Sequence, residues 1–308
     1  MSNENQDAGL LLVTGASGQL GRRVLAHLLD TVRVAPSRIV AVTRTPAKLA
    51  DITARGVDVR QGDFDDPASL GAAFKGVQRL LLISTDTLDR PGARLAQHRT
   101  AVAAAKAAGV RHVVYTSIPK ADEIPVPFAP DHAGTEEALA ASGLGWTILR
   151  NALYYDNLAF SLPSVLATGK WFTSAGDGRI SNVSREDCAR AAAYALAAAS
   201  NANATYDITG PAALTTAEIA ATVSEVLGKP IELVQLSDAD LTKGLVAAGL
   251  PDFLAKAFVS FDTTTRLGLF ASVSDAVEKL TGQKPETLRQ FLVANKDSLL
   301  SAALAGAH

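Results

Sequence analysis

The chain has 308 residues, of which 48% are apolar and 19% are charged, and its net charge is −2 at neutral pH. This balance is typical of a globular protein with a sizeable core and excludes a disordered chain. The small net charge gives no reason to expect nucleic acid or a membrane surface as a partner. The longest apolar run, at 191–199, has nine residues, whereas a membrane-spanning helix needs about 20.

Cysteine, histidine and the first residues limit the chemistry further. Cys188 is the single cysteine, which excludes an intramolecular disulfide and indicates a small buried apolar residue, not a nucleophile. The five histidines are dispersed and no HExxH or paired cysteine occurs, so we expect no metal site. The segment MSNENQD lacks the basic and apolar regions of a signal peptide, so we expect a cytoplasmic protein.

Short apolar runs alternate with helical segments through the first 150 residues. Strands are predicted at 10–13, 39–42, 57–59, 80–83, 113–115 and 146–149. Helices are predicted between them at 19–30, 46–54, 67–74, 91–108 and 131–142. Strands that are apolar throughout and separated by helices indicate a parallel sheet covered on both faces. The predicted fold is therefore α/β, with a Rossmann-type, doubly wound parallel sheet.

The chain changes character after residue 150. Helices are predicted at 185–199, 215–227 and 273–281, with short strands near 205–209 and 231–236. No repeat, low-complexity linker or charge block separates the two parts. We predict a cofactor-binding Rossmann domain at 1–150. The region 151–308 is predicted to be a smaller C-terminal α/β domain, mainly substrate-binding, with segments that return to the first domain.

A glycine-rich turn, TGASGQLG at 14–21, follows the first predicted strand and opens the first helix. Gly15 permits a tight turn, Gly18 lets backbone N–H groups approach a pyrophosphate, and Gly21 lets the helix pack closely on the sheet. The start of the helix also offers unpaired N–H groups to phosphates. This position favours a dinucleotide site over a plain turn. The residues assigned to that site are Gly15, Ser17, Gly18, Gln19, Leu20 and Gly21.

The end of the second predicted strand distinguishes the two nicotinamide cofactors. An Asp or Glu at this place binds the ribose 2′-hydroxyl of NAD, but the segment 43–48 contains no acid. Arg44 and Lys48 stand there instead and are suited to pair with a 2′-phosphate. We therefore predict NADP(H) as the cofactor; the alternative is that both residues belong to a solvated basic loop.

Residues at the ends of the other strands are predicted to frame the same cofactor, because ligands bind beyond the carboxyl ends of parallel strands. Asp63 and Phe64 are suited to the adenine, and Ser84 and Thr85 to the ribose side. The remaining strand-end residues are Thr116, Ser117 and Asn151. Each is ambiguous, since short polar side chains also end strands for local reasons.

Several segments in register resemble one known family. They are TGASGQLG at 14–21, VTRTPAK at 42–48, GDFDD at 62–66, AKAAGVRHVVYTS at 105–117, LRNALYYDN at 149–157 and VEKLTGQKPETLRQFL at 277–292. They resemble the NmrA-like group of atypical short-chain dehydrogenases, and within it the branch of type 2 NAD(P)H:quinone oxidoreductases and triphenylmethane reductases. The resemblance covers nearly the whole chain. It implies an NADPH-binding Rossmann domain, a smaller substrate domain, and direct hydride transfer to quinones or related electron-poor conjugated compounds.

The chain departs from the wider superfamily on the helix after the fifth strand. Ordinary short-chain dehydrogenases carry a Tyr-x-x-x-Lys pair there, whereas this chain has His132 and Glu136 at that spacing. The missing Tyr argues against alcohol dehydrogenase and sugar-epimerase chemistry, in which it protonates an alkoxide. A quinone is a strong hydride acceptor, so alignment with the nicotinamide is expected to supply most of the catalysis.

Few residues are therefore assigned to the reaction itself. His132 is a candidate proton donor, with a structural hydrogen-bonded histidine as the alternative. Asn151 and Tyr154 are candidates to orient the nicotinamide or the substrate oxygen, with core packing as the alternative for Tyr154. The predicted substrate-binding residues are Phe128, Tyr154, Trp171 and Phe172. Aromatic side chains can form the flat walls of a quinone pocket, although at such spacings they more often belong to a core.

The sequence thus predicts an NADP-dependent oxidoreductase that reduces a quinone-like small molecule, as a monomer or homodimer. A non-enzymatic, NmrA-like redox sensor, which passes the NADP/NADPH ratio to a protein partner, is the first alternative. A biosynthetic reductase or isomerase of a natural product on the same scaffold is the second.

Overall fold

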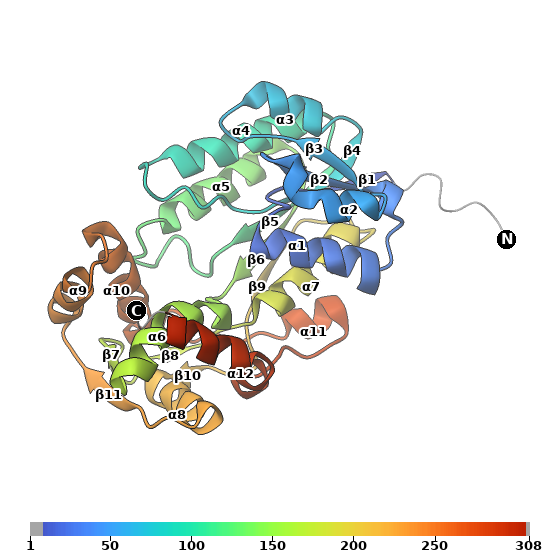
Figure 1. Cartoon of the computed structure of the whole chain (residues 1–308). Helices are drawn as coiled ribbons and strands as arrows, with labels where there is room; N and C mark the ends of the chain where they lie inside the picture. The colour runs from blue at the N-terminus through green and yellow to red at the C-terminus, as the bar shows by residue number, and fades with distance from the viewer. Residues whose placement is uncertain (1–8, 306–308) are drawn as a thin grey trace. The chain divides into compact units, whose positions relative to one another are not determined.

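The structure, a computed structural model, describes residues 9–305, with side chains as far as residue 301. The chain divides into two compact units (Figure 1). The first comprises Met1–Ile118, Pro130–Asn151 and Cys188–Tyr206, and the second comprises Pro119–Ala129, Ala152–Asp187 and Asp207–His308. The segment MSNENQD lies outside the described residues. The division of cofactor and substrate binding at residue 150 stays a prediction.

A seven-stranded sheet forms the centre of the first unit. Its strands are β1 (Leu10–Val13), β2 (Ile39–Thr43), β3 (Asp58–Gln61), β4 (Val77–Leu82), β5 (His112–Ser117), β6 (Gly145–Asn151) and β9 (Ala204–Ile208). Their order across the sheet is β3-β2-β1-β4-β5-β6-β9. The strands β1 to β6 pair in parallel throughout. The predicted α/β fold is confirmed, and the strand order reverses at β1 and β4, where such folds bind their ligands.

Helices cover both faces of this sheet. They are α1 (Gln19–Ala26), α2 (Ala50–Ala54), α3 (Pro67–Ala73), α4 (Ala93–Ala107), α5 (Ala129–Ser142) and α7 (Arg185–Ala197). In Figure 1, α3, α4 and α5 lie along one face, and α1 and α7 lie along the other. Leu70, Val102 and Leu139, from α3, α4 and α5, pack against buried strand residues in one core. Asp66 caps α3 by accepting hydrogen bonds from two backbone N–H groups, as the Asp66-Pro67 pair predicts.

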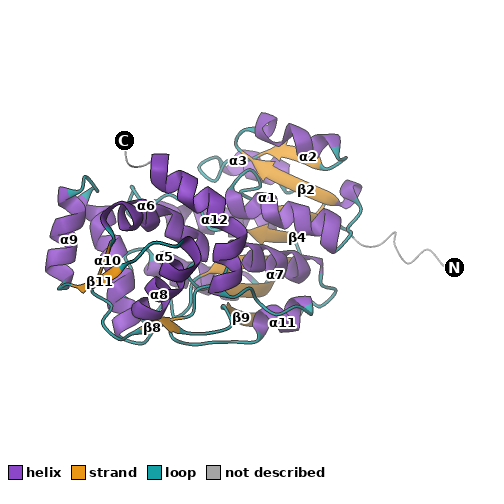
Figure 2. Ribbon diagram, turned by 60° about the horizontal axis from the view of Figure 1, so that its bottom comes forward, coloured by secondary structure: helices purple, strands orange, loops and turns teal. Residues whose placement is uncertain are grey.

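The second unit combines helices with two small sheets, and Figure 2 shows that helices predominate in it. Its helices are α6 (Leu158–Thr168), α8 (Thr216–Leu227), α9 (Asp238–Ala247), α10 (Asp252–Arg266), α11 (Ala276–Thr281) and α12 (Leu288–Ala305). One sheet pairs β7 (Lys170–Thr173) with β11 (Glu232–Gln235) in parallel, and the other pairs β8 (Arg179–Ile180) with β10 (Leu214–Thr215) antiparallel. Leu162, Val223 and Leu292, from α6, α8 and α12, share one buried core.

The structure differs from the sequence-based expectations mainly in the second unit. The helices α6, α9, α10 and α12 are not predicted from the residue pattern. Helix α6 contains Pro163, a residue that normally marks a helix boundary. The strands β8 and β10 have two residues each, which is too short for an alternating pattern to appear. In the first unit, the helix predicted at 19–30 is α1 followed by a π-helical turn at His27–Thr31.

Candidate functional site

The glycine turn joins β1 to α1 in the position that the sequence predicts. Gly15 has a φ of 57°, a left-handed conformation that favours glycine. A Cβ atom on Gly21 would lie 2.4 Å from the Gly15 carbonyl oxygen, so this helix position admits no side chain. Gly18 caps α1 without a side chain, and Gly15, Gly18 and Gln19 are exposed. The start of α1 is therefore exposed at Gly18 and Gln19, as a pyrophosphate bound there requires.

Two threonines that the sequence analysis does not single out hold this turn in place. Thr14 Oγ1 donates to the Leu81 carbonyl oxygen over 3.0 Å and accepts from the Ile83 N–H over 2.9 Å, which links β1 to the end of β4. Thr43 Oγ1, at the end of β2, lies 2.8 Å from Ser17 Oγ. The turn is thereby tied to both neighbouring strands. No local pattern signals these contacts, because each partner is at least 26 residues away.

Two cations follow β2, and the segment 43–48 contains no carboxylate. Arg44 and Lys48 are both exposed, as binding a 2′-phosphate requires. Arg22 of α1 is a third cation at this place, since its guanidinium donates to the Lys48 carbonyl oxygen and forms a 3.0 Å ion pair with Asp51. Sequence reasoning missed Arg22, which immediately follows the glycine turn. The hydrogen-bond donors of Arg44 and Lys48 fit a phosphorylated ribose. Their exposure is equally compatible with a solvated basic loop.

Asp63 and Phe64, the predicted adenine contacts, lie in a tight turn after β3. The Asp63 carboxylate accepts a hydrogen bond from the Asp65 N–H over 3.1 Å, and the backbone N–H of Asp63 donates to Ser69 Oγ over 2.9 Å. The Phe64 ring is partly buried against the core of the first unit. Both residues therefore have local structural functions, and their contact with adenine stays a prediction.

The ends of β4 and β5 are joined by side chains that accept backbone hydrogen bonds. The Ser84 N–H donates to Thr116 Oγ1 over 2.9 Å, and the Thr85 N–H donates to Nε2 of His98 over 3.0 Å. Thr116 is 2% exposed, which favours its strand-end function over a direct part in catalysis. Ser84 and Thr85 are half-buried.

Glu136 is held by two residues at the ends of β5 and β6. Ser117 Oγ donates to Glu136 Oε1 over 2.5 Å. Arg150 donates from Nε and Nη2 to the two carboxylate oxygens over 3.1 and 2.6 Å, a bidentate pair. The hydroxyl of Ser117 and the carboxylate of Glu136 are thus engaged with each other and with Arg150.

His132 occupies a buried position that favours a structural histidine over its assignment as a proton donor. It is 4% exposed and lies between Arg94, whose Nη2 is 2.9 Å from His132 Nε2, and Tyr115, whose hydroxyl is 2.8 Å from Nδ1. Burial first, and then the positive charge of Arg94, lower the pKa of His132 well below its usual value. The contacts and the lowered pKa favour the structural alternative, and the proton-donor assignment stays a prediction.

Asn151 ends β6, and Tyr154 follows it in the second unit. Asn151 is 6% exposed and lies at the carboxyl edge of the sheet, where the sequence analysis expects it. The Arg185 guanidinium lies 4.8 Å from the centroid of the Tyr154 ring and forms a 2.9 Å ion pair with Asp156. The half-buried Tyr154 ring is therefore held by a cation–π contact. Its contact with substrate stays a prediction.

The three other predicted substrate residues have different surroundings within the second unit. The Phe128 ring packs edge-on against Phe261, with centroids 6.1 Å apart. Trp171 packs against the buried core of the unit, whereas its neighbour Phe172 is 46% exposed. Trp171 and Phe172 are successive residues of β7 and so point to opposite faces. The core alternative therefore fits Trp171 better than Phe172.

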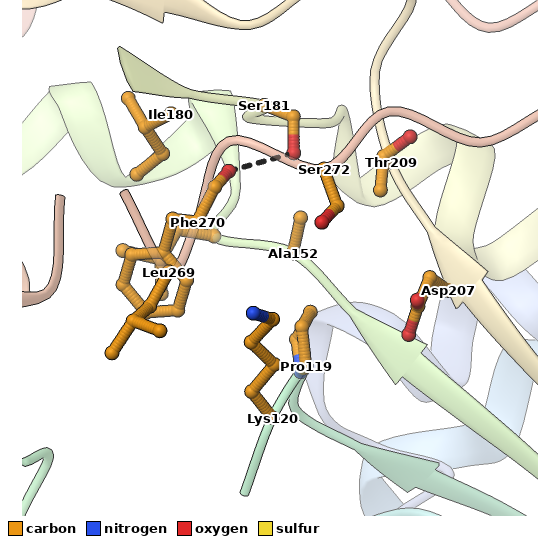
Figure 3. A pocket seen from close by; sticks show the side chains of 11 residues that line it. Pro119, Lys120, Ala152, Ile180, Ser181, Asp207, Thr209, Leu269, Phe270 and Ser272 are labelled. Carbon is orange, nitrogen blue, oxygen red and sulfur yellow. Dashed lines mark hydrogen bonds between the residues drawn. The ribbon is translucent and has the colours of Figure 1, made fainter. Parts of the chain in front are cut away.

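The second unit contains a pocket that the sequence analysis does not predict (Figure 3). It is lined by Pro119, Lys120, Ala152, Leu153, Ile180, Ser181, Asp207, Thr209, Leu269, Phe270 and Ser272. The dashed line in Figure 3 marks Ser181 Oγ donating to the Phe270 carbonyl oxygen over 3.1 Å. Of the described residues, none of the four aromatic side chains predicted for the substrate lines it.

Chain connectivity relates this pocket to the strand ends. Pro119 follows Ser117, the last residue of β5, by two positions, and Ala152 directly follows Asn151, the last residue of β6. Both lining residues therefore lie within two positions, along the chain, of a strand of the large sheet. Lys120 has a φ of 51°, unusual for a residue other than glycine, and such conformations cluster at functional sites. The sequence signal that could have pointed to Lys120 is its position shortly after the fifth strand.

Two further features concern the described part of the chain. No helix within residues 9–305 is long and apolar enough to cross a membrane. The same residues contain no group of three or more His, Cys, Asp or Glu side chains placed to hold a metal ion. Cys188 is 0% exposed, in agreement with its interpretation as a small core residue.

Comparisons with known proteins agree on one family. The model of the NmrA-like family matches residues 7–292. Quinone oxidoreductase 2 of Escherichia coli is 40% identical over 281 residues, which cover 91% of this chain and 96% of that protein. An NAD(P)H azoreductase of Xenophilus azovorans is 30% identical, and the match covers 93% of this chain and 98% of that protein.

Solved structures show the same likeness in three dimensions. The NADPH complex of the Escherichia coli NADPH-dependent quinone oxidoreductase has a TM-score of 0.86 and 38% identity, covering 95% of this chain and 99% of that one. The Citrobacter sp. triphenylmethane reductase in complex with NADP(H) has a TM-score of 0.85 and 35% identity, covering 92% and 99%.

Proposed function

Because the chain belongs to the NmrA-like family and is an NAD(P)H-dependent reductase of that family, we propose that it transfers a hydride from NADPH to a quinone or a similar electron-poor conjugated acceptor. The hydride adds to the quinone to give the hydroquinone anion, which takes a proton from solvent, and NADP⁺ is left behind. The observation that carries the choice of acceptor is the engagement of the acid–base positions on α5 by other protein groups.

The cofactor fits the first unit through groups described above. The glycine turn would hold the pyrophosphate with the first N–H groups of α1, and Arg44 and Lys48 would pair with the 2′-phosphate. Ser84 and Thr85 would line the ribose side, and Asp63 and Phe64 the adenine. The bound cofactor would supply the hydride at C4 of its nicotinamide, and Asn151, the last residue of β6, would orient that ring.

The engagement of His132 and Glu136 by other protein groups suits a quinone better than a ketone. Reduction of a ketone produces a localised alkoxide that needs a proton donor, whereas the charge on a reduced quinone is spread over a conjugated ring. His132 is buried and neutral, and Glu136 is bound by Ser117 and Arg150. Catalysis therefore depends on how the protein positions the nicotinamide and the acceptor, and positioning alone can remove a large part of an activation barrier.

The pocket of the second unit is the proposed place for the acceptor. Its walls combine apolar side chains such as Leu269 and Phe270 with a few polar groups, among them Lys120 and Ser181. Figure 3 shows the Lys120 side chain extending among the lining residues, where its ammonium would stabilise negative charge on a reduced oxygen. Tyr154, Phe128, Trp171 and Phe172 remain proposed contacts.

Anaerobic stopped-flow absorbance with NADPH tests this function directly. The wild-type protein is expected to oxidise NADPH in the presence of a benzoquinone, with azo and cationic triphenylmethane dyes as further acceptors. Failure to oxidise NADPH with any acceptor of this panel would overturn the proposal. Equal affinity for NADP⁺ and NADPH without turnover would support the redox-sensor alternative, and turnover with other conjugated natural products alone would support a biosynthetic reductase.

A further inference from the structure

A group of buried polar side chains joins α4, β5 and α5 in the first unit. Its members are Arg94, His98, Tyr115, His132 and Thr135, and we call it the His98–His132 network. Each of them is at most 6% exposed. Buried polar atoms are stable only when they are hydrogen-bonded, so the direction of each bond in this network is constrained.

The protonated nitrogen of His98 can be assigned because one of its partners, the backbone N–H of Thr85, can only donate. The backbone N–H of Thr85 donates to Nε2 of His98 over 3.0 Å, so this nitrogen carries no proton. Nδ1 therefore bears the hydrogen and donates to Thr135 Oγ1, which is 2.9 Å away. The Thr135 hydroxyl in turn donates to the carbonyl oxygen of Asp131 over 2.6 Å.

The same reasoning applies to the second imidazole. A guanidinium has no acceptor, so Nη2 of Arg94 donates to Nε2 of His132 over 2.9 Å. Nδ1 of His132 then donates to the Tyr115 hydroxyl over 2.8 Å. The Tyr115 hydroxyl also lies 3.5 Å from Nδ1 of His98, which connects the two histidines. Both imidazoles are neutral and protonated on Nδ1.

This network ends on the loop that follows β4, at the predicted ribose side of the cofactor. We propose that His98 is a positioning residue of the cofactor site, which holds the Thr85 N–H and thereby sets the course of the backbone at Ser84 and Thr85. The inference rests on the proposed function, because it assumes that NADPH binds at this loop. The neighbouring Ser84 N–H is held in a similar way by Thr116 Oγ1. The N–H groups of Ser84 and Thr85 therefore both donate to buried side chains.

Replacement of His98 separates positioning from mere stability. His98→Phe keeps a ring but removes the acceptor for the Thr85 N–H. The Kd for NADPH, measured by fluorescence titration, should rise about tenfold, while kcat at saturating NADPH should change by less than about twofold. His98→Gln offers an oxygen to the same N–H and should bring the Kd back to within about threefold of wild type.

His112 provides the matched control. It is also 0% exposed, and its Nε2 lies 2.8 Å from Thr147 Oγ1, but it stands at the first residue of β5, far along the strand from the cofactor end. His112→Phe should lower Tm and leave the Kd for NADPH unchanged. The proposal is overturned if His98→Phe also leaves that Kd unchanged, or if both variants change it equally.

Nitrogen-15 NMR of the wild-type imidazoles adds a readout that needs no variant. At neutral pH, His98 should show a protonated Nδ1 and an unprotonated Nε2. A proton on Nε2 of His98 would overturn the proposal even if His98→Phe failed to fold. Wild-type protein that binds no NADPH would contradict both this inference and the proposed function, whereas NADPH binding without quinone reduction would contradict the proposed function alone.

Discussion

The predicted cofactor site of the first unit is made mainly of backbone groups, whereas the pocket of the second unit is lined by side chains from five separate segments. In the first unit, buried side chains such as Thr14 and His98 hold strand ends, and the ligand would meet N–H groups. In the second unit, Lys120 and Phe270 would meet the ligand themselves. The first kind of site fixes the class of cofactor, and the second kind can change its substrate by single substitutions.

The largest effect is expected where the backbone site has no room for a side chain. In Gly21→Ala, the added Cβ would lie 2.4 Å from the Gly15 carbonyl oxygen, so the turn must move. A displacement of about 1 Å at a reaction site costs about 100-fold, and we expect kcat/KM for NADPH in steady-state kinetics to fall by about that factor.

Gly71 in α3 supplies the control for that substitution, because no atom lies within 4 Å of the position of its Cβ. Gly71→Ala should leave kcat/KM for NADPH unchanged and raise the free energy of unfolding by up to about 1 kcal/mol. Unchanged kinetics in Gly21→Ala would show that the turn is looser than the structure indicates.

A smaller effect, on cofactor choice alone, is expected at the end of β2. Arg44→Ala removes a charged hydrogen bond worth about 2 kcal/mol, so the ratio of kcat/KM for NADPH to that for NADH should fall about 30-fold. Lys106→Ala, an exposed lysine of α4, should leave the ratio as it is. An unchanged ratio in Arg44→Ala would support the solvated basic loop.

The buried histidines beneath the cofactor site predict a loss of stability in acid. Burial, and next the charge of Arg94, lower the pKa of His98 from 6.5 to about 3. The unfolded chain therefore takes up a proton below pH 6.5 that the folded chain does not, and the free energy of unfolding falls as the pH decreases from 6.5 toward 3. His98 should contribute about 2 kcal/mol of this loss at pH 5.

Thermal unfolding of the wild type and His98→Gln at pH 7.5 and 5.0 measures this contribution. The Tm of the variant should depend less on pH, because its amide does not titrate. Identical pH dependence in both proteins would mean that His98 is charged or already accessible in the folded state.

The smallest effect is expected in the pocket of the second unit, where Lys120 is partly exposed and forms a 3.7 Å ion pair with Glu123. Lys120→Met should lower kcat/KM for a quinone about fivefold, since a partly exposed charge is worth up to about 1 kcal/mol. The KM for NADPH should not change. A cationic triphenylmethane acceptor should be spared or even favoured, because it loses charge on reduction.

Lys279→Met is the control, since Lys279 is also ion-paired, at 3.0 Å from Asp275, and lies on α11 of the same unit. It should behave as wild type with both acceptors. Equal losses for quinone and cationic dye in Lys120→Met would contradict an electrostatic function of this lysine.

The same two regions differ in how far they could be predicted from the residues. The glycine turn, Arg44 and the Asp66-Pro67 cap are local patterns, and the structure places each where the pattern predicts. The threonine contacts beneath the turn and the His98 contact with Thr85 have no local signal. The pocket was missed for a related reason, because its walls come from segments as far apart as Lys120 and Ser272.

Residue order alone was sufficient to predict most strands and helices of the parallel sheet, the glycine turn and the missing Tyr-x-x-x-Lys pair. Each of these is a pattern of residues within a few positions of one another. Folding was needed to show that His132 is buried and neutral, and that Glu136 is bound by Ser117 and Arg150. The physical reason is that the pKa and hydrogen-bond partners of a side chain depend on segments remote in the chain. An exposed histidine can donate a proton near neutral pH. His132, enclosed by Arg94 and Tyr115, serves as a hydrogen-bonding group.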